Sequence, residues 1–437
     1  MKTFELKDFI KTKENSNVHT EEEINFFIRN LNSFSQDEIA GWLKAVKANG
    51  MNDKETSALT MAMANSGVML TWKDLEPTLD KHSTGGIGDK ITLLVLPLLA
   101  AYGELYGPPK INIPKLSGRG LGITGGTVDK LESIPGFKTS LSIDQIKEQV
   151  KKISLAICSA SGDLAPADKK LYAIRDVTNT TDSIPLIASS VMSKKIAGGA
   201  QNIILDVKFG SGAFMKKSED AKLLAQTMVS IGKSLKRKIK AVISNMNQPL
   251  GYAVGNALEI KEVLEILSGK EVGDLVEITI GLAKEAITLI DTNVMARHEL
   301  SEELRKLLLK GGTLAKFEEM VIAQGGNLKA PLKKANHIEI VKSEFDGYIQ
   351  NIDALVIGEA VHALGAGRKT VSDQIDHSVG VLFYKKYGDR IKKGEPLLEI
   401  HSKNKQDTEL SKQKLTKAIK YSQAQPSKLK LVEEIVE

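Results

Sequence analysis

Apolar residues in the first 72 positions recur every three or four residues, which is the spacing of amphipathic helices. The segments Thr20–Glu23 and Ser35–Glu38 are capping boxes that precede such runs, and Asn52–Glu55 resembles a third. The pattern therefore predicts a helical domain over residues 1–72. The apolar positions that follow these three segments are Ile24, Phe27, Ile28, Leu31, Ile39, Trp42, Leu43, Val46, Leu59, Met61 and Met63.

After this domain the pattern changes to short apolar strands alternating with helices, which is typical of an α/β domain. A helical pair at about 162–198 interrupts it, with Pro166 and Pro185 at the helix starts, and is expected to rejoin the N-terminal helices. The α/β domain would then comprise residues 73–161 and 199–330. Its predicted helices span about 89–102, 143–153 and 218–235, and its predicted strands about 110–113, 155–158, 203–208 and 241–243.

In the last hundred or so residues, apolar and polar positions alternate around glycine turns, as in 345–350 and 387–400. This alternation predicts a small β-rich domain over residues 335–437. The expected fold is multidomain, α and α/β: an all-helical domain facing a mixed α/β sheet domain, plus a C-terminal α+β domain. Because the chain crosses between the first two layers several times, we expect a cleft that closes by hinge motion.

The composition is that of a globular protein, with 42% hydrophobic and 26% charged residues. A net charge of +6 is small for 437 residues and aromatic residues are only 5%, which disfavours a nucleic-acid partner but allows small anionic substrates. The apolar run Ile91–Ala101 is far shorter than the ~20 residues that span a bilayer, so no membrane partner is expected. With a single cysteine, Cys158, and no secretion signal, we expect a cytoplasmic protein.

Two glycine-rich segments, Asp80–Asp89 and Lys115–Glu132, carry hydroxyl groups and cations. Glycine lets backbone N–H groups approach an anion closely, and hydroxyls donate further hydrogen bonds. The pair predicts one site for an anion such as phosphate, with ordinary surface turns as the alternative. The hydroxyl and cationic residues are Lys81, Ser83, Thr84, Lys115, Ser117, Arg119, Thr124 and Thr127.

The helical pair carries a second set of polar residues. Tyr172 and Arg175 are three positions apart, and Ile187, Ser190 and Lys194 follow at i, i+3 and i+7, so each set shares one helix face. Such a face would suit a planar polar ligand, with donors for its carbonyl oxygens and an apolar floor. A solvated lysine or arginine is the alternative interpretation.

His82 lies between Lys81 and Ser83. As a neutral imidazole it could donate a hydrogen bond to a leaving group, because the flanking cations would keep its pKa low. A structural histidine in a turn is the alternative.

The segment Gly120–Gly125 matches a dinucleotide-binding pattern, but the required acid is misplaced and Pro114 is expected to break the preceding strand. The chain has no nucleoside-triphosphate loop and no clustered His/Cys set for a transition metal. We therefore expect no organic cofactor.

Taken together, these residues resemble a known family. Lys115–Glu132 closely resembles S-G-R-G-L-x-x-T-G-G-T-x-D-K-L-E, the signature of the class II nucleoside phosphorylases, which include thymidine and pyrimidine-nucleoside phosphorylases. The resemblance extends over nearly the whole chain, including Gly365–Arg368. It implies a helical domain facing an α/β domain across a cleft, a C-terminal α+β domain and a homodimer. The other similar blocks are 80–89, 165–176, 183–195 and 206–215.

The resemblance also implies roles for individual residues. Pyrimidine would be held by Arg175, Ser190 and Lys194, with Tyr172 and His82 close by, and His82, Arg175 and Lys194 would be catalytic. Phosphate would be held on the α/β side by Lys81, Ser83, Thr92, Lys115, Ser117 and Thr127.

Three positions depart from the family pattern. Ile123 replaces a usual histidine, and Ala160 a frequent glutamine, which would alter the polar edge of the pocket. Lys90 stands where some relatives use a threonine to bind a monovalent cation. The sequence therefore leaves open whether potassium binds at this site. The other residues that match the cation site are retained: Gly88, Leu250, Ala253 and Glu262.

The activity implied is reversible phosphorolysis: a pyrimidine nucleoside and orthophosphate give free base and α-D-(deoxy)ribose 1-phosphate. One alternative is a transferase similar to anthranilate phosphoribosyltransferase, which would need acidic magnesium ligands near the glycine segment. Another is a phosphate- or nucleoside-binding protein without catalysis.

Overall fold

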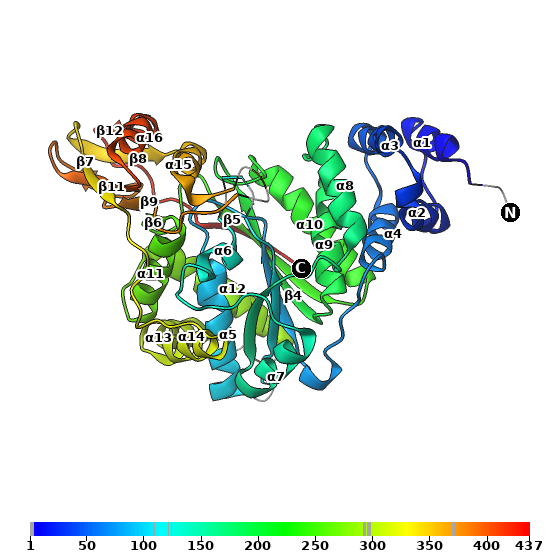
Figure 1. Ribbon diagram of the computed structural model, residues 1–437, viewed down its shortest axis with the longest axis horizontal. Coiled ribbons are helices and arrows are strands. Elements are labelled where there is room, and N and C mark those ends of the chain that lie inside the picture. The colour runs from blue at the N-terminus through cyan, green and yellow to red at the C-terminus, as the bar shows by residue number, and fades with distance from the viewer. Residues whose placement is uncertain are drawn as a thin grey trace.

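The computed structural model describes residues 4–107, 110–120, 122–123, 125–291, 294, 299–368, 370 and 373–437. Figure 1 shows the N-terminal helices at one end of the molecule, an α/β layer structure in the middle and a small mixed domain at the other end. The expected fold class is confirmed.

The N-terminal helices α1–α4 pack with the helical pair α8 and α9. All three capping segments form: Thr20, Ser35 and Asn52 each accept a hydrogen bond from the backbone three residues later, and the glutamate there bonds back. Side chains from both parts of the chain share one core, in which Trp42 and Leu171 are buried. The helices are α1 Leu6–Glu14, α2 Glu21–Arg29, α3 Gln36–Asn49, α4 Asp53–Ala64, α8 Pro166–Val177 and α9 Ile184–Ala197, with a 3₁₀ turn at Leu31–Ser33.

The central sheet has the order β1-β4-β5-β13, in which the first three strands are parallel. A two-stranded parallel sheet, β2-β3, adjoins it through a bridge between Thr78 and Asn112. Helices α5 and α12 cover one face of the central sheet, and α9 and α10 cover the other. The strands are β1 Leu79–Ser83, β2 Ile113–Ser117, β3 Leu155–Ser159, β4 Asn202–Phe209 and β5 Lys238–Asn245.

The helices expected at about 89–102, 143–153 and 218–235 are confirmed as α5, α7 and α10, whereas α6 and α11–α14 were not predicted from the sequence. Helix α5 is buried along most of its length, but no helix among the described residues is both long and apolar enough to cross a membrane. The helices are α5 Ile91–Tyr106, α6 Thr127–Leu131, α7 Ile143–Ile153, α10 Ser218–Ser234, α11 Asn256–Leu267, α12 Gly273–Ile290, α13 Leu300–Leu309 and α14 Gly312–Ala323, with a 3₁₀ turn at Lys73–Leu75.

The strand expected at about 110–113 lies three residues later, and the expectation that Pro114 breaks it is wrong. Pro114 lies inside β2, opposite Ala156 of β3. The N–H of Ile113 donates to the Ser154 carbonyl at 2.8 Å. Because successive N–H positions face opposite sides of a strand, the Pro114 nitrogen faces away from β3 and no hydrogen bond of this pair is lost.

The small domain holds two antiparallel sheets, β10-β8-β12 and β6-β9-β11-β7. The chain leaves it at the end: β13, Val432–Val436, pairs antiparallel with β5 of the central sheet, and Figure 1 shows the C-terminus there. The range 335–437 therefore does not lie wholly in one domain. The remaining elements are β6 Ala253–Val254, β7 His337–Lys342, β8 Gly347–Ile352, α15 Ala354–Val361, a π-helical turn His362–Ala366, β9 Gly380–Phe383, β10 Arg390–Ile391, β11 Pro396–Ser402, α16 Lys405–Lys417 and β12 Ile419–Ser422.

Candidate functional site

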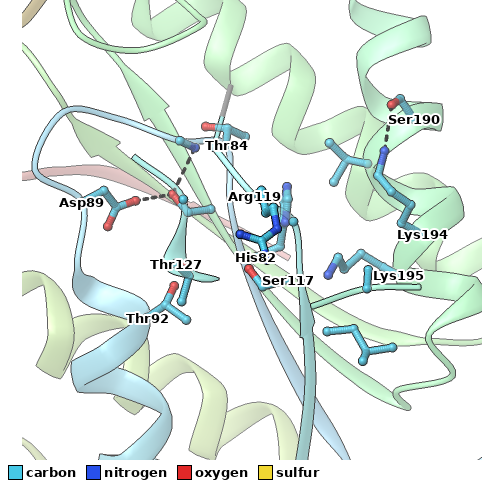
Figure 2. A pocket seen from close by; sticks show the side chains of 18 of the residues that line it. His82, Thr84, Asp89, Thr92, Ser117, Arg119, Thr127, Ser190, Lys194 and Lys195 are labelled. Carbon is cyan, nitrogen blue, oxygen red and sulfur yellow. Dashed lines mark hydrogen bonds between the residues drawn. The ribbon is translucent and has the colours of Figure 1, made fainter. Parts of the chain in front are cut away.

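A cavity of about 490 Å³ lies where β1 and β2 end, opposite α8 and α9. In Figure 2, Ser190, Lys194 and Lys195 extend into it from the helical side, facing the β-strand ends. Each residue to which the family resemblance gives a phosphate- or pyrimidine-binding role lines this cavity. These residues are Lys81, His82, Ser83, Thr92, Lys115, Ser117, Thr127, Tyr172, Arg175, Ser190 and Lys194.

The first glycine segment begins as a strand and turns at the cavity. Ser83 ends β1; its hydroxyl donates to Asp89 Oδ2 at 2.5 Å and accepts from the N–H of Gly85 at 3.2 Å. Gly88 has a φ of 70°, and a Cβ there would lie 2.6 Å from the Leu250 carbonyl oxygen, so only glycine fits. The loop is therefore held in one shape by its own hydroxyl and by close backbone packing.

The second segment follows β2 and leads into α6. Ser117 ends the strand, and Thr127 is the first residue of the helix after Gly126. A Cβ on Gly126 would lie 2.2 Å from the Gly120 nitrogen, so the two ends of the loop touch. This closure brings the hydroxyls of Ser117 and Thr127 to the same cavity.

The two lysines of the strand ends are paired with carboxylates. Lys81 is fully buried; its Nζ donates to Thr92 Oγ1 at 3.2 Å and lies 3.2 Å from Asp206 Oδ2. Lys115 Nζ donates to Asp80 Oδ1 at 2.8 Å and to the carbonyl of Lys81 at 2.6 Å. An anion in the cavity would share these cations with the carboxylates.

Asp80 also binds a lysine from the opposite layer. Lys195, on α9, donates to Asp80 Oδ2 at 2.7 Å, so one carboxylate holds two ammonium groups. Burial, only partly offset by Asp80 and reinforced by Lys195, lowers the pKa of Lys115 to about 7. Burial opposes ionisation of Asp80, but Lys115 and Lys195 outweigh it and hold its pKa well below the usual range.

The wall of the cavity that α8 and α9 form, the helical wall, holds its polar groups in a fixed arrangement. Lys194 Nζ donates to Asp168 Oδ2 at 2.5 Å and to Ser190 Oγ at 3.1 Å. A lysine ammonium has three donors, so one is left for a ligand. Tyr172 places its ring 5.6 Å below the Arg175 guanidinium.

Arg175 also supports the connection between α8 and α9. It is buried, and its guanidinium donates to the backbone carbonyls of Thr180, Thr181 and Leu186 at 2.9–3.3 Å. Five N–H donors are available to an arginine, so two remain. The residue thus has a structural role in addition to the predicted ligand contact.

His82 lies between the two walls. Burial, followed by the charges of Lys195 and Lys115, lowers the pKa of His82 well below its ordinary value. The side chain is therefore a neutral imidazole near neutral pH. It can donate one hydrogen bond but cannot serve as an imidazolium acid.

Comparison with known proteins places this geometry in a family. Residues 7–67 match the helical bundle domain of a glycosyl transferase family, 75–314 match its a/b domain, and 348–422 match the pyrimidine nucleoside phosphorylase C-terminal domain. A pyrimidine-nucleoside phosphorylase of Geobacillus stearothermophilus is 44% identical, with 95% of this chain and 96% of the relative covered. The chain belongs to the pyrimidine-nucleoside phosphorylase family. The predicted membership of the class II nucleoside phosphorylases is confirmed.

Further similarities agree with this family and its fold. The pyrimidine-nucleoside phosphorylases of Staphylococcus haemolyticus (strain JCSC1435) and Staphylococcus aureus (strain N315) are 44% and 45% identical, covering 99% and 94% of this chain and 99% and 95% of the relatives. The crystal structure of anthranilate phosphoribosyltransferase from Thermus thermophilus has a TM-score of 0.56 at 18% identity. It covers 72% of this chain and 99% of its own. The similarity to anthranilate phosphoribosyltransferase concerns the fold alone.

In this phosphorylase-family chain, Lys90 occupies the expected cation site. Its Nζ donates to the carbonyls of Leu250 and Ala253 at 2.9 and 2.8 Å and to Glu262 Oε2 at 2.7 Å. Burial opposes its charge, but Glu262 and Glu259 outweigh this and raise the pKa of Lys90. The ammonium uses the oxygens that would ligate potassium, so these residues do not fit the ion.

The other two departures from the phosphorylase pattern lie in different surroundings. Ala160 lines the cavity, whereas Ile123 packs against the apolar core of the C-terminal domain. Phe214 lines the cavity and is partly exposed. Leu121 and Thr124, both within the second glycine segment, lie outside the described residues.

Sequence reasoning assigned no role to Asp80 or Lys195. Both lie in segments that resemble the phosphorylases, but their pairing links residues 115 positions apart. The available signal was a second lysine directly after Lys194 on a helix with no other charged residue. Among the described residues, no group of three or more His, Cys, Asp or Glu side chains could hold a metal ion.

Proposed function

We propose that this chain catalyses the reversible phosphorolysis of pyrimidine ribonucleosides and deoxyribonucleosides. One observation carries the proposal: a single cavity has hydroxyls and lysines at two strand ends on one side and the Arg175–Ser190–Lys194 face on the other. Relatives of 44–45% identity named pyrimidine-nucleoside phosphorylase support it.

In the proposed reaction, orthophosphate lies against Lys81, Lys115 and the loop hydroxyls. A phosphate oxygen forms a bond to C1′ of the pentose while the bond from C1′ to the base nitrogen breaks, with inversion at C1′. The departing base keeps the electron pair of that bond and is then protonated from water. The products are free base and α-D-(deoxy)ribose 1-phosphate.

Negative charge that develops on the departing base gives a role to the donors on α8 and α9. The free donors of Arg175 and Lys194 can bind the base oxygens more strongly in the transition state than in the substrate. Neutral His82 can add one hydrogen bond. Because phosphate is itself the nucleophile, no covalent enzyme intermediate is needed.

We also infer a homodimer and a cytoplasmic location, in line with the family relation and the single buried cysteine, Cys158. Size-exclusion chromatography with light scattering should give twice the mass of one chain. Cell fractionation should recover the protein with the cytosolic fraction.

The test of the activity is incubation with phosphate and uridine, thymidine or deoxyuridine, followed by detection of free base and pentose 1-phosphate. Parallel reactions omit phosphate or replace it with a phosphoribosyl pyrophosphate, magnesium and anthranilate. Phosphate-dependent release of base supports phosphorolysis. Product only with the pyrophosphate substrate would assign a transferase, and binding without turnover would assign a non-catalytic protein.

A further inference from the structure

A turn of the C-terminal domain, Gly365–Arg368, fits against the second glycine loop of the cavity. Gly365 has a φ of 103°, which lets the chain reverse after the π-helical turn. The turn is fixed from the α/β side, because Asn256 Nδ2 donates to the Ala366 carbonyl at 3.0 Å. The N–H of Gly122, in the glycine loop, donates to the Arg368 carbonyl at 3.0 Å.

The side chain of Arg368 continues this contact into the loop. Its Nη1 donates to Asp129 Oδ1 at 2.7 Å, and the other oxygen of Asp129 accepts a hydrogen bond from the N–H of Gly120 at 2.6 Å. Asp129 is fully buried and Arg368 is 9% exposed. A buried carboxylate needs such a cation, so the guanidinium fixes the carboxylate that fixes the loop backbone.

The Gly365–Arg368 turn and the second glycine loop are packed too closely for either to move by itself. A Cβ on Gly367 would lie 2.7 Å from the Gly122 carbonyl oxygen. Gly120 and Gly126 touch at the other side of the loop, as described above. A shift of Arg368 would therefore move Gly120 and, with it, Gly126, which directly precedes Thr127, a hydroxyl residue that lines the cavity.

Apolar contacts bind both glycine loops to the same domain. Ile87, from the first loop, and Ile123, from the second, belong to the apolar cluster of the C-terminal domain. Both lie against Gly358 of α15, where a Cβ would be 2.4 Å from Ile87 Cδ1 and 3.6 Å from Ile123 Cβ. The C-terminal domain thus contacts each loop of the anion site behind the cavity.

We propose that Arg368 is a positioning residue for the phosphate-binding loop and that the C-terminal domain completes the phosphate site through it. Arg368 does not line the cavity, so it acts through Asp129 and the Gly120 backbone. The inference rests on the proposed function in one respect: it takes the anion of these loops to be orthophosphate.

The experiment compares the full-length wild-type protein with Arg368→Met and Arg368→Lys. Methionine keeps an apolar stem and removes every donor, whereas lysine restores one cation for Asp129. Arg390→Met is the matched control, because Arg390 is exposed on β10 of the same domain. The measurements are kcat, KM for phosphate, KM for uridine, and the Kd of orthophosphate by calorimetry.

We expect Arg368→Met to raise KM and Kd for phosphate about 10-fold or more, with KM for uridine changed less than about threefold, and Arg368→Lys to lie between. A merely structural residue would lower the melting temperature without this split. If Arg368→Met does not fold, Arg368→Lys decides. Wild-type phosphate KM and Kd in the folded variants would overturn the proposal. If the wild type binds phosphate but releases no base, the proposed activity fails while the Kd comparison still tests Arg368.

Discussion

Lys81, Lys115 and Lys194 each contact a carboxylate as well as the cavity. Removing such a carboxylate would leave a buried or half-buried cation uncompensated, so the acids belong to the site as much as the cations do. The consequence for function is that the site has few remaining N–H donors, and these are held in fixed directions. Donors held in this way stabilise the transition state when they point at the atoms on which charge develops.

The role of Lys194 can be tested by Lys194→Met. We expect kcat/KM for uridine to fall about 10²–10³-fold, because one donor to the departing base is lost. Lys169→Met is the control, since Lys169 is exposed on α8. Steady-state kinetics and thermal unfolding are measured for both, and a folded Lys194→Met variant with near wild-type kcat/KM would exclude Lys194 from the mechanism.

From the lowered pKa of Lys115 we predict that the protein takes up a proton when phosphate binds. With a pKa of about 7, Lys115 is mainly neutral in the free protein at about pH 8, and a bound dianion favours its charged form. Calorimetry of phosphate binding in buffers of different ionisation enthalpy should show uptake of up to about one proton. In Lys195→Met the neighbouring charge that lowers this pKa is gone, so uptake should shrink; equal uptake in both proteins would contradict this assignment.

At the scale of elements, Lys90 holds the loop that carries Leu250 and Ala253 to the start of α5. We propose that activity does not depend on potassium, because the ammonium supplies the charge and donors that these oxygens require. Assays with and without potassium should give equal rates for the wild type.

Two replacements of Lys90 make this test specific. Lys90→Thr restores a hydroxyl oxygen and should become active in proportion to added potassium. Lys90→Met fills similar space without any oxygen, so potassium should not rescue it. Strong activation of the wild type by potassium would refute the substitution of ammonium for the ion.

The helical domain contains a buried histidine that links its stability to pH. His19 stacks on Phe9 and accepts a hydrogen bond from Trp42 Nε1 at 3.2 Å. Burial, followed by the charge of Lys13, lowers the pKa of His19 to about 4. Since the unfolded chain titrates near 6.5, protonation favours the unfolded state below that pH.

We therefore expect the free energy of unfolding to fall as pH decreases from about 6.5 towards about 4, by up to roughly 3 kcal/mol from this residue. Urea unfolding followed by tryptophan fluorescence measures it. His19→Gln keeps an acceptor for Trp42 and should remove this part of the pH dependence, whereas His337→Gln, on the small domain, should not. Identical pH profiles for wild type and His19→Gln would contradict the assignment.

At the scale of the molecule, the two walls of the cavity belong to different layers that are joined along α9. Met192 and Ile196 of this helix share an apolar core with Ile203 and Leu205 of β4, and the pair of Lys195 with Asp80 crosses between the layers. We expect opening to occur as a rotation about α9, because this attachment holds the two layers together there. The loop hydroxyls and the donors on α8 and α9 would then approach one another only when the layers close.

We expect closure when both subsites are filled, because a misplacement of about 1 Å can reduce a rate ~10²-fold. Solution scattering with phosphate and a nonreactive nucleoside analogue should give a smaller radius of gyration than the protein without ligands. Phosphate alone is the control and should produce a smaller change. An unchanged scattering profile with both ligands would indicate a permanently closed site.

Much of the site could be predicted from local patterns, but its pairings could not. The hydroxyls and cations of the two glycine segments, and the face with Ser190 and Lys194, were recognised because each depends on spacing within a few residues. Which carboxylate each cation meets depends on contacts between distant segments. Arg368 illustrates the point, since its partner Asp129 is 239 residues away.

The sequence alone determined the starts of the three helices that begin with capping boxes, the order of helical, α/β and β-rich regions, and the family, because capping, periodicity and motifs are local properties. Only the tertiary structure decided that β2 includes Pro114, that β13 returns to the central sheet and that Lys90 occupies the cation site. The register of a strand and the partner of a buried charge are set by whichever distant segment packs beside them. No pattern within one segment contains that information.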